Sequence, residues 1–167
     1  MKKAIDLDWS SINHFSPSEW PKDSLEHLNA DVVLALDELR GRLGKAIYPT
    51  PLAGGWYRKR GSKTSRHYAE GRLSDAGDFF TDANTLDALL HITSMPQIGG
   101  VGVYLDTFYR NQSWPMFHID LRAHDAQSPR QFWGRISGVY YYPLRDAGSR
   151  DIFWRQLVRY HIDLDEV

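Results

Sequence analysis

Ionisable and apolar side chains alternate in the segment from residue 115 to 122, which we expect to form a strand. Successive side chains of a strand point to opposite faces. One face would therefore be fully apolar, while the other would carry His118, Asp120 and Arg122. This pattern is typical of a strand whose polar face meets water. It is also what a reactive site would need, provided that further polar groups converge on His118.

An earlier polar segment contains two such groups, His67 and Asp78. The chain has no cysteine, so a metal would have to be bound by imidazole and carboxylate alone. Two His and one Asp leave the fourth tetrahedral position open for water, as hydrolytic zinc requires. In the simpler interpretation, Asp78 caps a turn and His67 is a solvated loop residue. The residues by themselves leave both interpretations open.

The overall composition excludes several other functions. The formal net charge is -1, which gives no basic surface for DNA or RNA, so we expect no nucleic-acid partner. No stretch approaches the ~20 apolar residues that a membrane span needs, and we expect no membrane association. The amino terminus, MKKAIDLDWSS, does not resemble a signal peptide. We therefore expect a chain that stays in the cytoplasm or reaches the cell wall through lysis.

We expect residues 1–167 to form a single α+β domain whose sheet is mainly antiparallel, with flanking helices. Apolar spacings of three and four predict a helix that starts at Ser16-Pro17 and ends between Gly41 and Gly44. Residues 46–57 look extended, and residues 58–75 form a long polar loop. The other predicted elements are strands at 76–80, 99–105, 115–122 and 136–142, and helices at 82–95 and 149–162, the last capped by Ser149.

Three of these segments also resemble a known family. Ser65-Arg66-His67, Ala76-Gly77-Asp78 and the strand FHIDLR at 117–122 are similar to the signature of the zinc D-Ala-D-Ala carboxypeptidases and endopeptidases. That family includes phage endolysins and has the hedgehog-type fold. Further segments resemble its landmarks in the same order, and these are FSPSEW at 15–20, LDELR at 36–40, GWYR at 55–58 and GGVGVY at 99–104.

The resemblance implies that Zn²⁺ is bound by His67, Asp78 and His118. His67 and Asp78 lie further apart than the corresponding family residues, so the loop carries an insertion or Asp75 is the ligand instead. We prefer Asp78, because Ala-x-Asp followed by a strand is the better local match. Many relatives place an acid three residues before the last His, and Pro115 occupies that position here. The identity of the general base is therefore open.

The resemblance also implies roles for other residues. Asp120 is the candidate for general base or for orienting His118, and Asp106 is the second candidate for the base. Arg58 matches the family arginine that binds a substrate carboxylate or steadies the oxyanion, and Arg60 would replace it if the register shifts. We interpret an aromatic group near the end of the chain as core and cleft wall, and it comprises Trp133, Tyr140, Tyr141 and Tyr142.

The expected activity is hydrolysis of D-amino-acid-containing bonds in peptidoglycan stem peptides, by a carboxypeptidase or an endopeptidase, with a phage lysin as one possibility. The altered spacing of His67 and Asp78 and the missing upstream acid favour an alternative. In that alternative the chain is a catalytically inactive, hedgehog-like module that binds zinc or serves as a phage structural part.

Overall fold

Pairing between strands that are distant in the sequence organises this chain. The structure is a computed structural model that describes the backbone of residues 1–165 and the side chains of residues 1–160. The helices are α1 (Ser24–His27), α2 (Ala30–Leu43), α3 (Thr85–Ser94) and α4 (Ala147–Asp165). The strands are β1 (Ile47–Pro49), β2 (Ala76–Thr81), β3 (Gly100–Tyr104), β4 (Phe108–Tyr109), β5 (Gln112–Ser113), β6 (Met116–Asp120), β7 (Gln131–Ile136) and β8 (Val139–Tyr141).

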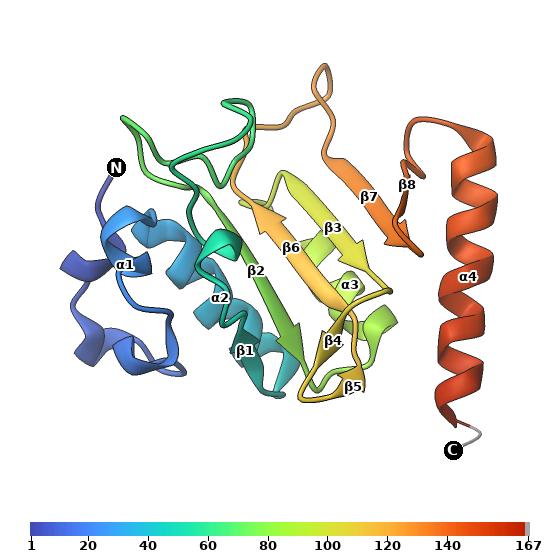
Figure 1. Cartoon of the computed structure of the whole chain (residues 1–167), viewed down its shortest axis with the longest axis horizontal. Helices are drawn as coiled ribbons and strands as arrows, with labels where there is room; N and C mark the ends of the chain where they lie inside the picture. Colours follow the sequence, from blue (N-terminus) through green and yellow to red (C-terminus); the bar gives the residue numbers. More distant parts are fainter. Residues whose placement is uncertain (166–167) are drawn as a thin grey trace.

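Six of these strands form one sheet in the order β1-β2-β6-β3-β7-β8 (Figure 1). Strands β3 and β7 run parallel, and the other neighbouring strands of this sheet run antiparallel. Strands β4 and β5 form a separate two-stranded ribbon. The predicted α+β class with a mainly antiparallel sheet is therefore confirmed. No helix in the described part of the chain is long and apolar enough to cross a membrane.

The main core lies between the sheet and the helices α2 and α3, which Figure 1 draws behind it. Phe117 and Ile119 of β6 are buried in this core. Their neighbours His118 and Asp120 point to the other face of the sheet, as the alternation of side chains predicted. The side chain of Asn29 accepts a hydrogen bond from Asp31 at the start of α2, and Gly44 ends that helix in the left-handed conformation.

The prediction of one long helix from Ser16 to the glycines is wrong. The segment contains a 3-10 turn at Pro17–Glu19, then α1, and only then α2. Between the two helices the backbone at Asn29 donates to Ser74 at 2.8 Å, and Ser74 donates back to His27 at 2.8 Å. The helix is interrupted because this backbone pairs with the loop that precedes β2, a contact that apolar periodicity does not report.

Two predictions near the carboxyl end are also wrong. The segment expected to be one strand at 136–142 is a hairpin that contains the end of β7, the strand β8, and between them a turn in which Ser137 and Gly138 have φ angles of 49° and 80°. Positive φ at both central residues gives the tight turn that antiparallel strands prefer. In α4, Ser149 lies inside the helix, and the Asp146 carboxylate accepts from its backbone N–H at 2.6 Å. Asp146 therefore supplies the cap that we had assigned to Ser149.

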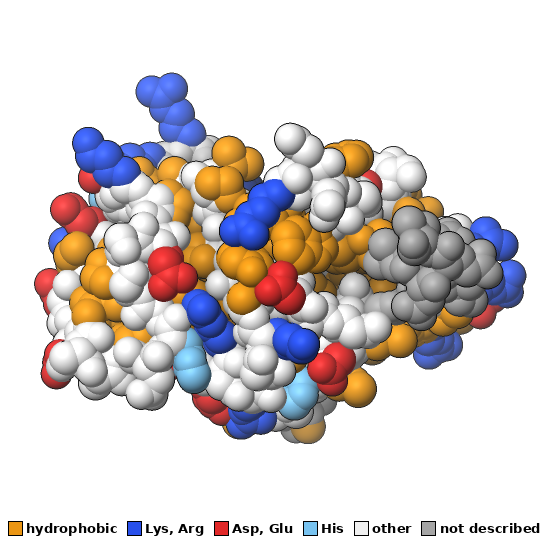
Figure 2. Space-filling view, turned by 90° about the horizontal axis from the view of Figure 1, so that it is seen from below, with side chains coloured by type: hydrophobic (Ala, Val, Ile, Leu, Met, Phe, Trp, Pro, Cys, Tyr) orange, Lys and Arg blue, Asp and Glu red, His pale blue; other side chains and the backbone are white. Residues whose placement is uncertain are grey.

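Aromatic side chains cover the end of the molecule that carries the β4–β5 ribbon. Tyr109 stacks on Phe80 at 4.5 Å between ring centroids, and Trp114 packs on Tyr109 at 5.3 Å. The Arg110 guanidinium lies over the ring of Tyr48 at 4.6 Å. Figure 2 views the molecule from this side and shows hydrophobic atoms at the surface among charged ones. These contacts hold the ribbon against the ends of β1 and β2.

We predict that Gly134→Ala destabilises the protein by about 1–3 kcal/mol, because overpacking a filled core has that cost. A Cβ at Gly134 of β7 would lie 2.0 Å from the ring of Phe153, which is fully buried and anchors α4. Urea unfolding measures the change. Gly148→Ala is the matched control, since its Cβ would make an ordinary contact at 3.5 Å. Equal stability of the two variants would contradict this packing.

Candidate metal centre

Three buried polar residues meet on the face of the sheet opposite α2 and α3. Asp78 lies on β2 and His118 on β6, and they are direct partners in the antiparallel register of these strands. His67 comes from the long loop before β2. Their exposed fractions are 4% for His67, 6% for Asp78 and 5% for His118. The three form the one group of His, Cys, Asp and Glu side chains among the described residues that could hold a metal ion.

The backbone of the loop fixes the position of His67. Arg58 donates its N–H to the His67 carbonyl at 2.6 Å, and Ala69 donates to the Arg58 carbonyl at 2.9 Å. Asp75 closes the other end of the loop, where its carboxylate binds the guanidinium of Arg66 at 3.0 Å. Asp75 is thus held in an ion pair, while Asp78 joins the two histidines. The structure therefore supports Asp78, and not Asp75, as the carboxylate of the cluster.

The spacing of the three facing atoms fits a tetrahedral ion. His118 Nδ1 is 2.8 Å from Asp78 Oδ1 and 3.1 Å from His67 Nε2. The third side of the triangle, from His67 Nε2 to Asp78 Oδ1, is 3.3 Å. Two ligand atoms bound tetrahedrally at 2.0–2.1 Å from zinc would be about 3.3 Å apart. The residues therefore fit a metal with three protein ligands, and these ligands occupy one face of the tetrahedron.

Asp120 supports the cluster from behind His118. Its Oδ2 lies 3.2 Å from His118 Nε2, and its carboxylate also binds the guanidinium of Arg122. Its side chain is fully buried. A carboxylate that holds the second nitrogen of a metal-ligating histidine fixes the tautomer and direction of the ring. Of the two roles that we predicted for Asp120, orienting His118 is the one that this geometry supports, because Asp120 does not line the open pocket.

Burial and pairing act in opposite directions on the pKa values of the cluster. Burial lowers the pKa of His118, but hydrogen bonds to Asp120 and Asp78 outweigh it and raise the pKa to about 9. Burial would raise the pKa of the Asp78 carboxyl, yet the two histidines keep that pKa below its ordinary value. For His67, burial is the largest effect and lowers its pKa. The cluster without metal is therefore a paired, charged group in a dry environment.

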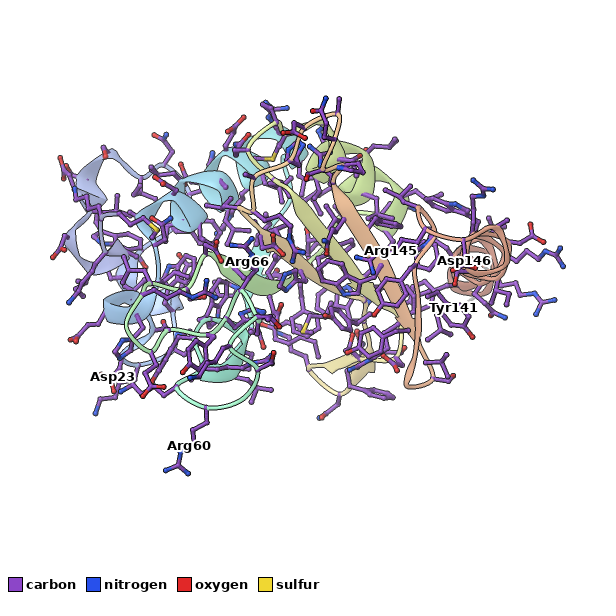
Figure 3. The ribbon with its side chains drawn as sticks, turned by 90° about the horizontal axis from the view of Figure 1, so that it is seen from above. Asp23, Arg60, Arg66, Tyr141, Arg145 and Asp146 are labelled. Carbon is purple, nitrogen blue, oxygen red and sulfur yellow. The ribbon has the colours of Figure 1, made fainter. Side chains whose placement is uncertain are left out.

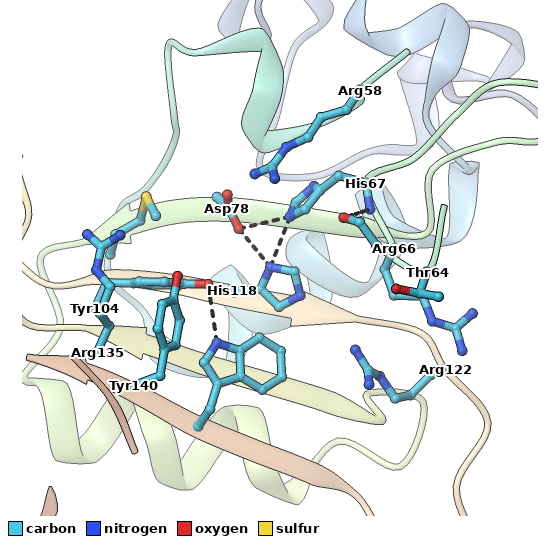
Figure 4. A pocket seen from close by; sticks show the side chains of 13 residues that line it. Arg58, Thr64, Arg66, His67, Asp78, Tyr104, His118, Arg122, Arg135 and Tyr140 are labelled. Carbon is cyan, nitrogen blue, oxygen red and sulfur yellow. Dashed lines mark hydrogen bonds and ion pairs between the residues drawn. The ribbon is translucent and has the colours of Figure 1, made fainter. Parts of the chain in front are cut away.

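The cluster opens onto a cavity of about 310 Å³ (Figure 4). Arg58 reaches toward His67 and Asp78 from one side, with its Nε bonded to the Gly54 carbonyl at 2.7 Å. The side chain of Arg60, our alternative to Arg58, extends away from the molecule (Figure 3). Of the two arginines, Arg58 is the one that lines the cavity.

Asp106 does not line this cavity. It follows β3, and its carboxylate accepts from Arg135 at 2.8 Å and from the Gly138 N–H at 2.7 Å. Asp78 is the one carboxylate among the residues that line the cavity, and it belongs to the metal cluster. The structure therefore brings neither Asp106 nor Asp120 to the open side of the site, where a general base would act.

Tyrosine and tryptophan side chains form the opposite wall. Trp133 and Tyr140, which we expected in a cleft wall, line the cavity, whereas Tyr104 and Arg135 were not predicted as site residues. Trp133 donates its indole N–H to the Tyr104 hydroxyl oxygen at 3.2 Å. Figure 4 shows this hydroxyl on the side of its ring that faces Asp78 and His118. Tyr104 ends the segment GGVGVY, which served above as a landmark of the resemblance but was not used to predict a site residue.

A search of protein-family models, of curated proteins and of solved structures found no match for this chain. The interpretation of the site therefore depends on its own geometry and on the motifs in the sequence.

We predict that the purified protein binds one metal ion per chain and that His118→Ala abolishes this binding, because two ligands remain where three are needed. Elemental analysis after reconstitution measures the metal content and identifies the ion. His124→Ala is the matched control, since His124 is half-buried, is bonded to the Pro96 carbonyl and is not part of the cluster. Metal retained by His118→Ala, or lost from His124→Ala, would contradict the assignment.

The stability of the metal-free protein should fall as the pH rises through about 9. The raised pKa of His118 stabilises the folded state fully below the unfolded pKa of about 6.5, and that contribution is lost once the folded group deprotonates near 9. The loss is roughly 3 kcal/mol, from 1.36 kcal/mol per pKa unit. Urea unfolding in a chelator between pH 6 and 10 measures it. His118→Asn should lack this slope, and an equal slope in both proteins would contradict the prediction.

Proposed function

We propose that this chain is a zinc-dependent peptidase that hydrolyses D-amino-acid-containing peptide bonds of peptidoglycan. The proposal includes membership of the D-Ala-D-Ala carboxypeptidase and endopeptidase family, which the ordered motifs resemble, and its hedgehog-type fold. The observation that carries it is the triangle of His67, Asp78 and His118, spaced as on one face of a tetrahedron and open to a cavity on the fourth side. A structural zinc site would close that position with a fourth protein ligand.

Zinc in this position would lower the pKa of a bound water and polarise the scissile carbonyl. The chain supplies the surroundings that make this chemistry selective. Asp120 keeps His118 in one tautomer, with Nδ1 directed at the metal position. Arg58 has no carboxylate partner among the described residues, and its guanidinium lies at the edge of the cluster. It is therefore available to bind the carboxylate of a peptide substrate through paired hydrogen bonds.

Tyr104 is the residue best placed to assist a developing negative charge. Its hydroxyl oxygen already accepts from Trp133, so its own hydrogen is directed elsewhere. Burial is the main reason that its pKa is raised above the ordinary value, and the hydroxyl keeps its proton at neutral pH. A fixed donor in a site shielded from water stabilises an oxyanion more than the same donor would in water.

One observation favours a second candidate, a zinc-binding module without catalysis. The cavity has no carboxylate besides Asp78 to accept a proton from water. An inactive hedgehog-like or phage structural module would have the same cluster and would lack a base in the same way.

Incubation of the metal-loaded protein with purified peptidoglycan separates the two candidates. Hydrolysis releases a free D-amino acid if the protein is a carboxypeptidase, and new amino groups within cross-links if it is an endopeptidase. Amino-group labelling and mass spectrometry of the soluble and insoluble fractions detect both. Activity that His118→Ala lacks supports the peptidase. Stoichiometric zinc without hydrolysis of any wall preparation would establish the inactive module.

We predict that Tyr104→Phe lowers kcat by about 100-fold while the zinc content is unchanged, since one oxyanion donor contributes about that factor. The expected effect on KM is small, because the hydroxyl acts on the charge that develops during the reaction. Tyr109→Phe is the control, as Tyr109 packs on Phe80 in the aromatic end of the molecule. Unchanged kcat in Tyr104→Phe would remove Tyr104 from the chemistry.

A further inference from the structure

The metal cavity continues into a groove across the sheet. A second cavity of about 320 Å³ shares Trp133 and Tyr140 with the metal cavity. A third cavity of about 390 Å³ shares Gln131 and Arg145 with the second. Arg122 lines all three. The three cavities therefore form one path that starts at the metal cluster and ends between β7 and the turn before α4.

The third cavity, at the end of this path away from the metal cluster, is called the far cavity and is strongly basic. Its lining includes no Asp or Glu and four arginines, and these are Arg66, Arg122, Arg130 and Arg145. Figure 3 labels two of them, Arg66 on the loop before β2 and Arg145 beside the start of α4. The two thus come from separate segments of the chain and line the same cavity.

Two of the four charges are already neutralised. Arg66 binds Asp75 at 3.0 Å, and Arg122 is bound to the buried Asp120. Arg130 donates to the backbone carbonyl of Met95 at 2.9 Å, and the Arg145 guanidinium packs over the Tyr142 ring at 5.1 Å. Neither has an acidic partner among the described residues. The positive charges of Arg130 and Arg145 therefore face the far cavity, and no acidic side chain among the described residues neutralises them.

Arg130 and Arg145 differ in what they offer a ligand. Arg130 uses donors on the carbonyls of Thr93 and Met95, so it contributes mainly charge. Arg145 is exposed, and none of its guanidinium N–H groups has a hydrogen-bond partner among the described residues. A guanidinium in that state binds a planar carboxylate with two parallel hydrogen bonds. The aromatic rings of Trp133, Tyr140 and Tyr142 line the path between this position and the metal.

We propose that the far cavity is a second anion subsite, which binds a carboxylate within an acidic peptide whose scissile bond lies at the metal cluster. The position of that scissile bond rests on the proposed peptidase function. Arg58 and Arg145 then bind two different carboxylates of one extended substrate. An open path with aromatic walls suits a peptide chain, and a phosphate-bearing wall polymer is the competing ligand that the test includes.

The test uses fluorescently labelled peptides that end in D-Ala-D-Ala and carry Glu at two, three or four residues before that dipeptide, with Gln in the matched peptides. Fluorescence anisotropy measures the Kd of each for the zinc-loaded protein. We expect one Glu peptide to bind roughly fivefold more tightly than its Gln partner, in the range of a partly exposed ion pair. Arg145→Gln should remove that preference.

Two further variants make the result specific. Arg150→Gln removes an exposed arginine of α4 that lines none of the three cavities, and it should retain the preference for Glu. Arg145→Glu should reverse it, so that a Lys peptide of the same length binds more tightly than the Glu peptide. Competition by a glycerol-phosphate oligomer, with no difference between Glu and Gln peptides, would overturn the acidic-peptide subsite in favour of a phosphate polymer.

The same peptides test the anion subsite and the peptidase activity separately. Selective binding of a Glu peptide that depends on Arg145, without hydrolysis of that peptide or of purified peptidoglycan, would support the subsite and reject the peptidase. Hydrolysis of Glu and Gln peptides with equal kcat/KM and equal Kd would support the peptidase and overturn the subsite. Absence of binding by every peptide would overturn the subsite as well.

Discussion

The antiparallel pairing of β2 with β6 is the constraint on which the site depends. It places Asp78 directly opposite His118, so that their side chains rise together from one face of the sheet. A shift of one residue in this register would turn His118 into the core and bring Phe117 to the site. The register is held because Phe79 and Phe117, on the other face, stack at 5.6 Å within the core. The apolar face of the sheet therefore determines the geometry of its polar face.

Burial of so many ionisable groups has a physical consequence. Unpaired charges in a dry environment are strongly destabilising, and a buried ion pair roughly balances this cost only when its hydrogen bonds are complete. Here the chain of contacts runs from Asp78 through His118 and Asp120 to Arg122 at the surface. A divalent ion would replace the proton on His118 and supply the positive charge that holds the carboxylate and the two imidazoles together.

The arginines around the groove divide into two kinds. Arg66, Arg122 and Arg135 each hold a carboxylate of the chain. They fix, in that order, the loop before β2, the Asp120 carboxylate behind His118, and the turn after β3. Arg58, Arg130 and Arg145 have no such partner among the described residues, and all three lie along the path of connected cavities. The position of acidic partners thus separates the arginines that hold the structure from those that we propose to bind a ligand, although the residue type is the same.

Local pattern determined a large part of this protein. Alternation along 115–122 predicted which side chains of β6 face the core, and the spacing of leucines predicted α2, because both depend on periods of two and 3.6 residues. Residue type made His67, Asp78 and His118 candidates for a metal site, and the resemblance of the motifs selected them as its ligands. Tertiary structure alone decided that Asp75 closes the loop on Arg66, that Ser74 interrupts the first helix, and that Tyr104 and Arg135 line the site. The Arg66–Asp75 pair spans nine residues within one loop, and the others join segments far apart in the chain. The energy of all these contacts is set by strand pairing and burial, which no local pattern contains.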